Sequence, residues 1–327
     1  MTLVVAYMRG GSTFTGDVMK QAEGTHYLYE PLHDLSIRID EGRTVTYMNG
    51  SEVKFTNKDI IARIKAEILK HWFLCQPENV DHGSLLVSHF LYHMRELSYH
   101  HRCQRQVHGD RVQIIEKCLP FLREKCLAAK IRTIKEISVN MDTIEHLLEI
   151  LPEVNIIHVV RDPRAIIDSQ ITSELIDKRK IPQEVDKLCQ SMQLNTGVLK
   201  KLLDAQTDRL RIITYEDFSL SPLETARDLY NFSGLQFTKR VESFLNRIAM
   251  SKGKVHPCRW CSAKGDSKMA SVKWRTRITK DVLDIVQKTC GNVMKSYGYK
   301  IIKDKATLSD MSVDTKEDIP NVINNIA

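Results

Sequence analysis

An apolar run of strand length that leads directly into a glycine-rich turn opens the chain and constrains its fold more than any other feature. Leu3 to Tyr7 has the composition of a buried strand, and Arg9 to Ser12 forms the turn. Phe14, Val18 and Met19 then recur at helical spacing. We therefore expect a strand, a tight turn and a helix, with the first N–H groups of the helix oriented to bind an anion.

Strand-like and helical segments alternate along the rest of the chain. Apolar and β-branched runs predict further strands at residues 26–29, 128–137, 154–160 and 210–215, and Asn49-Gly50 predicts a short hairpin. Helical spacing predicts helices at residues 59–74, 143–151, 222–232 and 281–294. Residues 75–108 are histidine-rich and poorly periodic, and we interpret them as helix and loop that cover the sheet. The alternation predicts an α/β fold with a central parallel sheet covered on both faces. We expect one domain at residues 1–300 and a polar, loose tail at residues 301–327.

A second sharp turn from strand to helix follows the apolar strand Val154 to Val160. Arg161 leaves the strand, Asp162 stands where a helix cap is favoured, and Pro163 occupies the first helical position. Ser169 comes eight residues after Arg161, two turns into the helix. Because ligands bind at the carboxyl ends of parallel strands, both sharp turns belong to the functional edge of the sheet. Arg161 and Ser169 can bind the same anion only if the loop between them folds back. The alternative interpretation is that Asp162 and Pro163 simply cap the helix.

The first turn, Arg9 to Phe14 (Arg-Gly-Gly-Ser-Thr-Phe), has the components of a phosphate-binding loop. Its glycines let successive N–H groups point at one anion, while the hydroxyls and the arginine add further donors. The Gly-Lys pair and the spacing of a Walker A loop are missing, which disfavours a magnesium-dependent NTPase. An ordinary glycine-rich turn with a serine cap is the alternative.

These motifs resemble those of the Golgi carbohydrate sulfotransferases, more narrowly the group that sulfates the 6-hydroxyl of galactose, N-acetylglucosamine or N-acetylgalactosamine. The similarity spans about residues 4–299 and rests on residues 7–14, 27–32, 159–169, 215–218 and 226–235. It implies a P-loop-like three-layer sandwich with a central parallel sheet, and a sulfotransferase catalytic domain at residues 1–300. It also implies 3′-phosphoadenylyl sulfate (PAPS) as the co-substrate, no metal, a glycan or glycosaminoglycan acceptor, and the Golgi lumen.

The resemblance assigns nucleotide-binding roles to ten residues. The 5′-phosphosulfate loop corresponds to Arg9, Gly10, Gly11, Ser12, Thr13 and Phe14, and the 3′-phosphate motif to Arg161 and Ser169. Lys264 and Arg275 fall where the family has a basic loop and a Trp-Arg pair that close over the nucleotide. The family usually has Ser or Thr where Gly10 stands and Arg where Thr214 stands. Compared with the family, this chain therefore lacks one hydroxyl donor and one positive charge.

Catalysis of sulfuryl transfer needs charge stabilisation and a base for the acceptor hydroxyl. Arg9 is the expected cation near the bridging oxygen, and Glu30, at the end of the second strand, is the expected base. A solvated loop acid before Pro31 is the alternative interpretation of Glu30. His33 is the second candidate for the base, because histidine titrates near neutrality. The family commonly has Trp at this position and His where Asp34 stands, so the usual histidine role is not carried over.

The composition excludes several other classes of protein. Lys plus Arg number 48 against 41 Asp plus Glu, a net charge of +7 that is spread along the chain, and no nucleic-acid-binding module is present. No apolar stretch of membrane-spanning length, signal peptide or anchor is visible in the sequence. His89 and His93 lack the Glu of a zinc protease, and Cys258-x-x-Cys261 is a single pair, so we expect no metal.

Two questions stay open at the level of the sequence. Eight cysteines fit either a few structural disulfides in an oxidising lumen or buried free thiols. The alternative functions are a P-loop kinase of a small molecule, and an inactive glycan-binding relative that has lost groups at Gly10 and Thr214. The acceptor sugar, its linkage, the disulfide pairing and the oligomeric state do not follow from the sequence.

Overall fold

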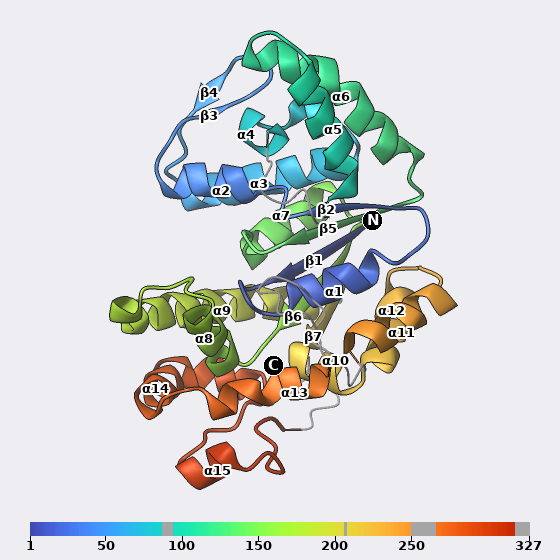
Figure 1. Ribbon diagram of the computed structural model, residues 1–327. Coiled ribbons are helices and arrows are strands. Elements are labelled where there is room, and N and C mark those ends of the chain that lie inside the picture. Colours follow the sequence, from blue (N-terminus) through green and yellow to red (C-terminus); the bar gives the residue numbers. More distant parts are fainter. Residues whose placement is uncertain (87–93, 206–207, 250–265, 318–327) are drawn as a thin grey trace. The chain divides into compact units, whose positions relative to one another are not determined.

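A computed structural model describes residues 1–86, 94–205, 208–249 and 266–317 (Figure 1). One sheet has the strand order β2-β5-β1-β6-β7. Its strands are β1 (Thr2–Ala6), β2 (Thr25–Tyr29), β5 (Ile131–Glu136), β6 (Asn155–Val160) and β7 (Leu210–Thr214). Strand β5 pairs in parallel with both β1 and β2. The predicted α/β fold with a central parallel sheet and flanking helices is confirmed.

The chain divides into two compact units. The first comprises Met1–Val5 and Met19–Ile156, and the second comprises Ala6–Val18 and Ile157–Ala327. The helices of the first unit are α2 (His33–Asp40), α3 (Lys58–Phe73), α4 (His82–Leu85), α5 (Arg95–Gln106), α6 (Arg111–Ala128) and α7 (Met141–Ile150). Those of the second begin with α1 (Ser12–Met19), α8 (Pro163–Thr172), α9 (Ile181–Asp204) and α10 (Tyr215–Leu220). They continue with α11 (Pro222–Phe232), α12 (Lys239–Ala249), α13 (Ser267–Val272), α14 (Lys280–Ser296) and α15 (Lys305–Ser309).

Local sequence signals explain the elements of the first unit. The Asn57 side chain accepts hydrogen bonds from the N–H groups of Asp59 and Ile60 and so caps α3, which packs against α7. The predicted hairpin is confirmed as β3 (Val45–Thr46) and β4 (Glu52–Val53), and Gly50 in its turn has φ +78°. That left-handed conformation explains why the Asn-Gly pair is a reliable turn signal.

Disulfides link several of the helices. Cys75 bonds to Cys126 and Cys103 to Cys118 in the first unit, and Cys189 bonds to Cys290 in the second, where it joins α9 to α14. The six cysteines within the described ranges are therefore all paired, which favours structural disulfides over free thiols. Cys258 and Cys261 lie outside the described residues.

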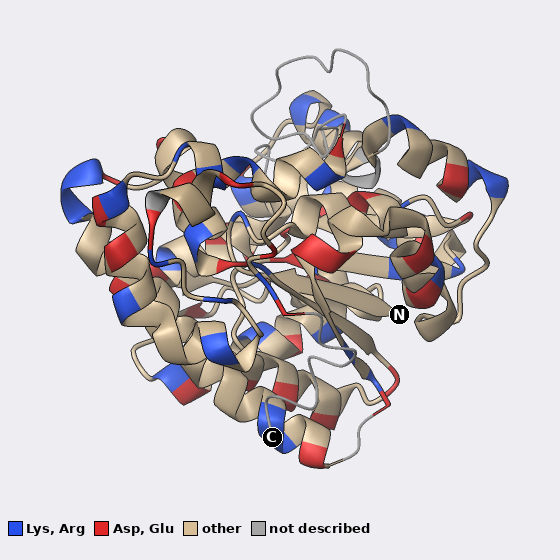
Figure 2. Ribbon diagram, turned by 90° about the horizontal axis from the view of Figure 1, so that it is seen from below, with Lys and Arg blue, Asp and Glu red and all other residues tan. Residues whose placement is uncertain are grey.

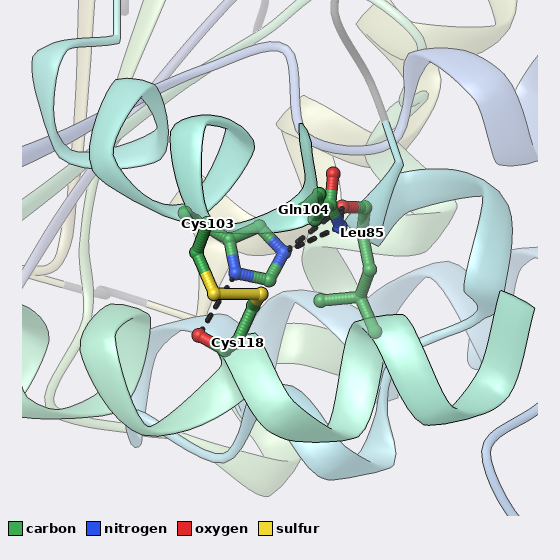
Figure 3. Close-up of a disulfide and its surroundings, with 5 residues drawn as sticks. Leu85, Cys103, Gln104 and Cys118 are labelled. Carbon is green, nitrogen blue, oxygen red and sulfur yellow. Dashed lines mark hydrogen bonds between the residues drawn. A yellow bond between two sulfur atoms is a disulfide. The ribbon is translucent and has the colours of Figure 1, made fainter. Parts of the chain in front are cut away.

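The bond between Cys103 and Cys118 joins α5 to α6, and Gln104 and Leu85 lie beside it (Figure 3). The ring of His100 is buried at the same place, with Nδ1 3.0 Å from the Cys118 carbonyl oxygen and Nε2 3.1 Å from the Leu85 carbonyl oxygen. Burial lowers the pKa of His100. This part of the histidine-rich stretch is therefore structural.

The C-terminal residues up to 317 are attached to the second unit. Their polar composition predicts a loose tail, but α15 forms here, and Tyr299 makes an antiparallel bridge with Lys316. The buried Arg275 guanidinium donates hydrogen bonds to the carbonyls of Thr307, Leu308, Asp310 and Val313 at 2.5–3.0 Å. One buried cation thus satisfies the backbone of a segment that has few apolar side chains of its own.

Along the helices, Lys and Arg alternate with Asp and Glu, in keeping with the modest net charge (Figure 2). None of the helices in the described ranges combines the length and the apolar character needed to cross a membrane.

Candidate functional site

The first turn, between β1 and α1, holds its backbone in unusual conformations. Arg9 has φ +70° and Gly11 φ +100°, and the Gly10 N–H donates to the Tyr7 carbonyl at 2.7 Å. A Cβ atom on Gly11 would lie 2.4 Å from Cδ2 of Tyr215, so only glycine fits. A left-handed arginine costs about 1 kcal/mol, and such strain is typical of ligand-binding loops.

The structure brings the two sharp turns together within the second unit. Arg9 Nε donates a hydrogen bond to Ser169 Oγ at 2.9 Å, and Arg161 Nη1 donates to the Arg9 carbonyl at 2.9 Å. Gln170, next to Ser169, donates to the Met8 carbonyl at 3.1 Å. Arg9, Arg161 and Ser169, which stand far apart in the sequence, therefore belong to one cluster.

Arg161 is poised to accept an anionic partner. Its guanidinium carbon lies 4.5 Å from the centre of the Tyr215 ring, and its Nε is buried with no hydrogen-bond partner among the described residues. An unsatisfied buried donor costs about 1–3 kcal/mol, so an acceptor atom of a ligand would stabilise it. Ser12 and Ser169, residues that are 4% and 8% exposed, add hydroxyls. This set of donors fits a phosphate group.

Two further residues of the first turn have different surroundings. Thr13 lies in the first turn of α1. The Phe14 ring packs against the rings of Phe218 at 4.7 Å and Tyr215 at 6.2 Å, measured between ring centres. Phe14 therefore anchors α1 to α10.

The helix cap that was the alternative interpretation of the second turn is also present. The Asp162 carboxylate accepts from the backbone N–H of Arg164 at 2.9 Å and forms a buried ion pair with the Arg164 guanidinium at 2.7 Å. Arg164 is fully buried, with its guanidinium carbon 4.9 Å from the centre of the Trp274 ring, and it donates to the Lys300 carbonyl at 2.8 Å. Asp162 and Arg164 fix the turn, and Arg161 remains directed at the cluster.

Glu216 is a feature of this site that the sequence analysis missed. Its carboxylate accepts from the Asp162 N–H at 3.2 Å and from the Tyr299 hydroxyl at 2.8 Å. Burial and the nearby Asp162 carboxylate raise the pKa of Glu216 to about 7, against the opposing effect of Arg161. Thr214, which stands where the resembled family has an arginine, is buried and caps α10 through the Asp217 N–H. For Glu216, the signal in the sequence was the acidic pair Glu216-Asp217 directly after the apolar run 210–215.

In the first unit, Glu30 is buried rather than solvated. It is 5% exposed, has φ +53°, and its carboxylate pairs with the ammonium of Lys135, which is 1% exposed. The Lys135 ammonium also lies 4.3 Å from the centre of the Tyr29 ring. The interpretation as a solvated loop acid is therefore wrong. The sequence signal for a buried role of Lys135 was its position inside the segment 128–137, which was predicted to be a strand.

A second buried carboxylate supports the backbone that follows Glu30. Glu136 accepts from the Leu32 N–H at 2.7 Å and from the N–H groups of Ile137 and Ser138 at 3.1 and 3.2 Å. Burial, followed by the Glu30 charge, raises the pKa of Glu136. The His33 N–H donates to the Glu30 carbonyl at 3.1 Å, so His33 begins α2 and Glu30 lies in the turn just before that helix.

The remaining predicted residues lie elsewhere or outside the described ranges. The contacts given for Arg275 are to the C-terminal carbonyls, and its role over the nucleotide stays a prediction. Lys264, His89 and His93 lie outside the described residues. Within the described ranges, no group of three or more His, Cys, Asp or Glu residues is arranged to hold a metal ion.

Comparison with known proteins identifies the family. Residues 2–239 match the model of the family described as "Sulfotransferase family". The chain belongs to the sulfotransferase family. Relatives include human carbohydrate sulfotransferase 3, which is 25% identical over 97% of this chain and 70% of its own length. Mouse carbohydrate sulfotransferase 5 is 24% identical over 95% of this chain and 84% of its own length.

The solved structures that match this chain are more distant in sequence. The sulfotransferase domain of a Synechococcus olefin synthase is 14% identical, with a TM-score of 0.44 over 88% of this chain and 93% of that chain. A mouse sulfotransferase complexed with PAP is 10% identical, with a TM-score of 0.43 over 90% of this chain and 84% of that chain.

Proposed function

We propose that this sulfotransferase moves the sulfuryl group of PAPS to a sugar hydroxyl of a glycan, at the 6-position of galactose, N-acetylglucosamine or N-acetylgalactosamine. The observation that carries the proposal is the cluster of Arg9, Arg161 and Ser169, in which Arg161 Nε is buried without a hydrogen-bond partner among the described residues. The names of the relatives support a carbohydrate acceptor. The three disulfides suit an oxidising compartment such as the Golgi lumen.

The proposed donor site uses groups of the second unit. Arg161 and Ser169 would bind the 3′-phosphate of PAPS, and the N–H groups and hydroxyls that follow Gly10 would bind its 5′-phosphosulfate. Arg9 would offset the charge that develops on the bridging oxygen as the sulfur–oxygen bond breaks. Because the sulfuryl group carries little net charge, cationic side chains and N–H groups are sufficient partners for it.

The proposed base is Glu30. It would take the proton of the acceptor hydroxyl while the sugar oxygen bonds to sulfur and adenosine 3′,5′-bisphosphate leaves. The buried Lys135 ammonium pairs with the Glu30 carboxylate and offsets the cost of burying it. His33 is the alternative base.

A transfer assay with labelled PAPS and a panel of galactose, N-acetylglucosamine and N-acetylgalactosamine glycans tests the proposal. We expect sulfate on one acceptor class, at least a hundredfold lower kcat in Glu30→Gln, and unchanged binding of adenosine 3′,5′-bisphosphate by that variant. Full activity of Glu30→Gln with loss of activity in His33→Ala would transfer the role of base to His33. Nucleotide binding without transfer to any acceptor would favour the inactive glycan-binding alternative.

A further inference from the structure

Two side-chain pairs tie the C-terminal residues to the start of α10 in the second unit. The Tyr299 hydroxyl donates to Glu216 at 2.8 Å, and the Lys316 ammonium lies 2.9 and 2.8 Å from the two carboxylate oxygens of Asp217. Tyr299 is 3% exposed, and the Lys316 side chain is 11% exposed. Since Glu216 and Asp217 are consecutive, both pairs act on the same helical turn.

Glu216 connects this helical turn to the anion-binding turn. Its other oxygen accepts from the N–H of Asp162, the residue directly after Arg161. A second connection runs through Arg164, which donates to the Lys300 carbonyl at 2.8 Å. The backbone that presents Arg161 is therefore held at two points by residues that follow α14.

The residues that follow α14 are themselves held by the end of the described chain. Lys300 N–H donates to the Thr315 carbonyl at 2.9 Å, and Glu317 N–H donates to the Gly298 carbonyl at 2.8 Å. Arg275 fixes the intervening backbone through its four carbonyl contacts. We call residues 299–317 the C-terminal strap.

We propose that the C-terminal strap positions the Arg161 turn for the nucleotide, through the Tyr299–Glu216 and Lys316–Asp217 pairs, and so sets the affinity for the 3′-phosphate. The inference rests on the proposed function. A guanidinium binds phosphate with two parallel hydrogen bonds only in the correct orientation, which supporting groups must maintain. Loss of either pair removes one donor from a carboxylate of α10 and leaves that carboxylate only its remaining contact, the Asp162 N–H for Glu216 or the Thr214 hydroxyl for Asp217.

Calorimetric titration with adenosine 3′,5′-bisphosphate tests this role in single variants of the full chain. We expect Tyr299→Phe to raise the Kd about three- to tenfold and Lys316→Ala about two- to fivefold, as is usual for one hydrogen bond or one partly exposed ion pair. Lys303→Ala removes an exposed lysine within the strap and should bind the bisphosphate as the wild type does. Thermal melting of each variant checks that it is folded.

Two further readouts separate positioning from a merely structural role. The KM for PAPS should rise in Tyr299→Phe and Lys316→Ala while kcat at saturating PAPS stays within about twofold, because neither residue is placed at the reacting atoms. The double variant Tyr299→Phe with Glu216→Gln should have a Kd only slightly higher than that of either single variant, because both substitutions break the same Tyr299–Glu216 interaction.

The outcomes distinguish this inference from the proposed function. If the wild-type chain binds the bisphosphate and both strap variants bind it equally well, the strap has no positioning role and the proposed function stands. If the folded wild type does not bind the bisphosphate, the proposed function is wrong, and the inference about the strap, which rests on it, is wrong as well. If Tyr299→Phe does not fold, the Kd of Lys316→Ala tests the inference alone. The Asp217 side chain is 48% exposed, so the chain should tolerate the loss of its Lys316 partner.

Discussion

Glu216 makes the stability of the second unit depend on pH in a predictable direction. Its carboxylate faces Asp162 and Arg161 at the second turn, Tyr299 after α14, and the neighbouring Asp217 on its own helix. The pKa rises from an ordinary 4.5 to about 7, mainly through burial. Between these values the folded chain holds a proton that the unfolded chain has released, so stability falls as the pH rises.

The size of the effect follows from the same pKa. Each pH unit in this window changes the free energy of unfolding by up to about 1.4 kcal/mol, so the whole window of about 2.5 units carries at most about 3.5 kcal/mol. Partial contact of Glu216 with solvent reduces this, and we expect about 2 kcal/mol. Glu216→Gln removes the titration and retains an oxygen that can accept from the Asp162 N–H.

Urea unfolding of the wild type and Glu216→Gln at pH 5 and pH 8 measures the difference. The variant should be about as stable as the wild type at pH 5 and about 2 kcal/mol more stable at pH 8, with equal m-values as a check. Glu224→Gln, at an exposed glutamate of α11, is the matched control and should not show this divergence. A stability difference between Glu216→Gln and wild type that is the same at both pH values would refute the reasoning.

Three other substitutions give sharp expectations. Gly11→Ala places a Cβ atom 2.4 Å from a ring carbon and should weaken bisphosphate binding at least tenfold in a folded protein, as calorimetry would show. Removing the bond between Cys189 and Cys290, which are 101 residues apart, should lower the free energy of unfolding by about 2–4 kcal/mol, measured in urea without reductant; an unchanged midpoint would contradict this. Lys135→Met should destabilise the chain by about 3–5 kcal/mol because it leaves Glu30 buried without its cation. Adding Glu30→Gln should restore that stability but not transfer activity, and a double variant as unstable as the single one would be evidence against the ion pair.

The sequence predicts those parts of the fold that local patterns determine. The first strand and its glycine turn, the Asn49-Gly50 hairpin and the helix opened by Asp162-Pro163 all follow from spacing or turn chemistry within a few residues. The sequence predicts that Arg161 and Ser169 share an anion site only if the loop folds back, and it does not predict their contacts with Arg9, which depend on how the two turns fold together.

Features that depend on distant partners could not be predicted in this way. Lys135 is 105 residues from Glu30, and no periodicity connects them. Tyr299, the partner of Glu216, is 83 residues away, just before the region where the polar composition predicts little order. Burial of Arg275 among backbone carbonyls gives that region its structure, and composition does not reveal such an arrangement.

Titration of the purified chain with adenosine 3′,5′-bisphosphate, alongside ATP with magnesium, tests the central claim most directly. We predict micromolar binding of the bisphosphate, no competition by ATP, loss of binding in Arg161→Ala, and no loss in the control Arg179→Ala, whose side chain is 89% exposed. ATP binding that requires magnesium would favour a kinase. A folded chain that does not bind the bisphosphate would contradict the assignment of Arg9, Arg161 and Ser169 to a nucleotide site.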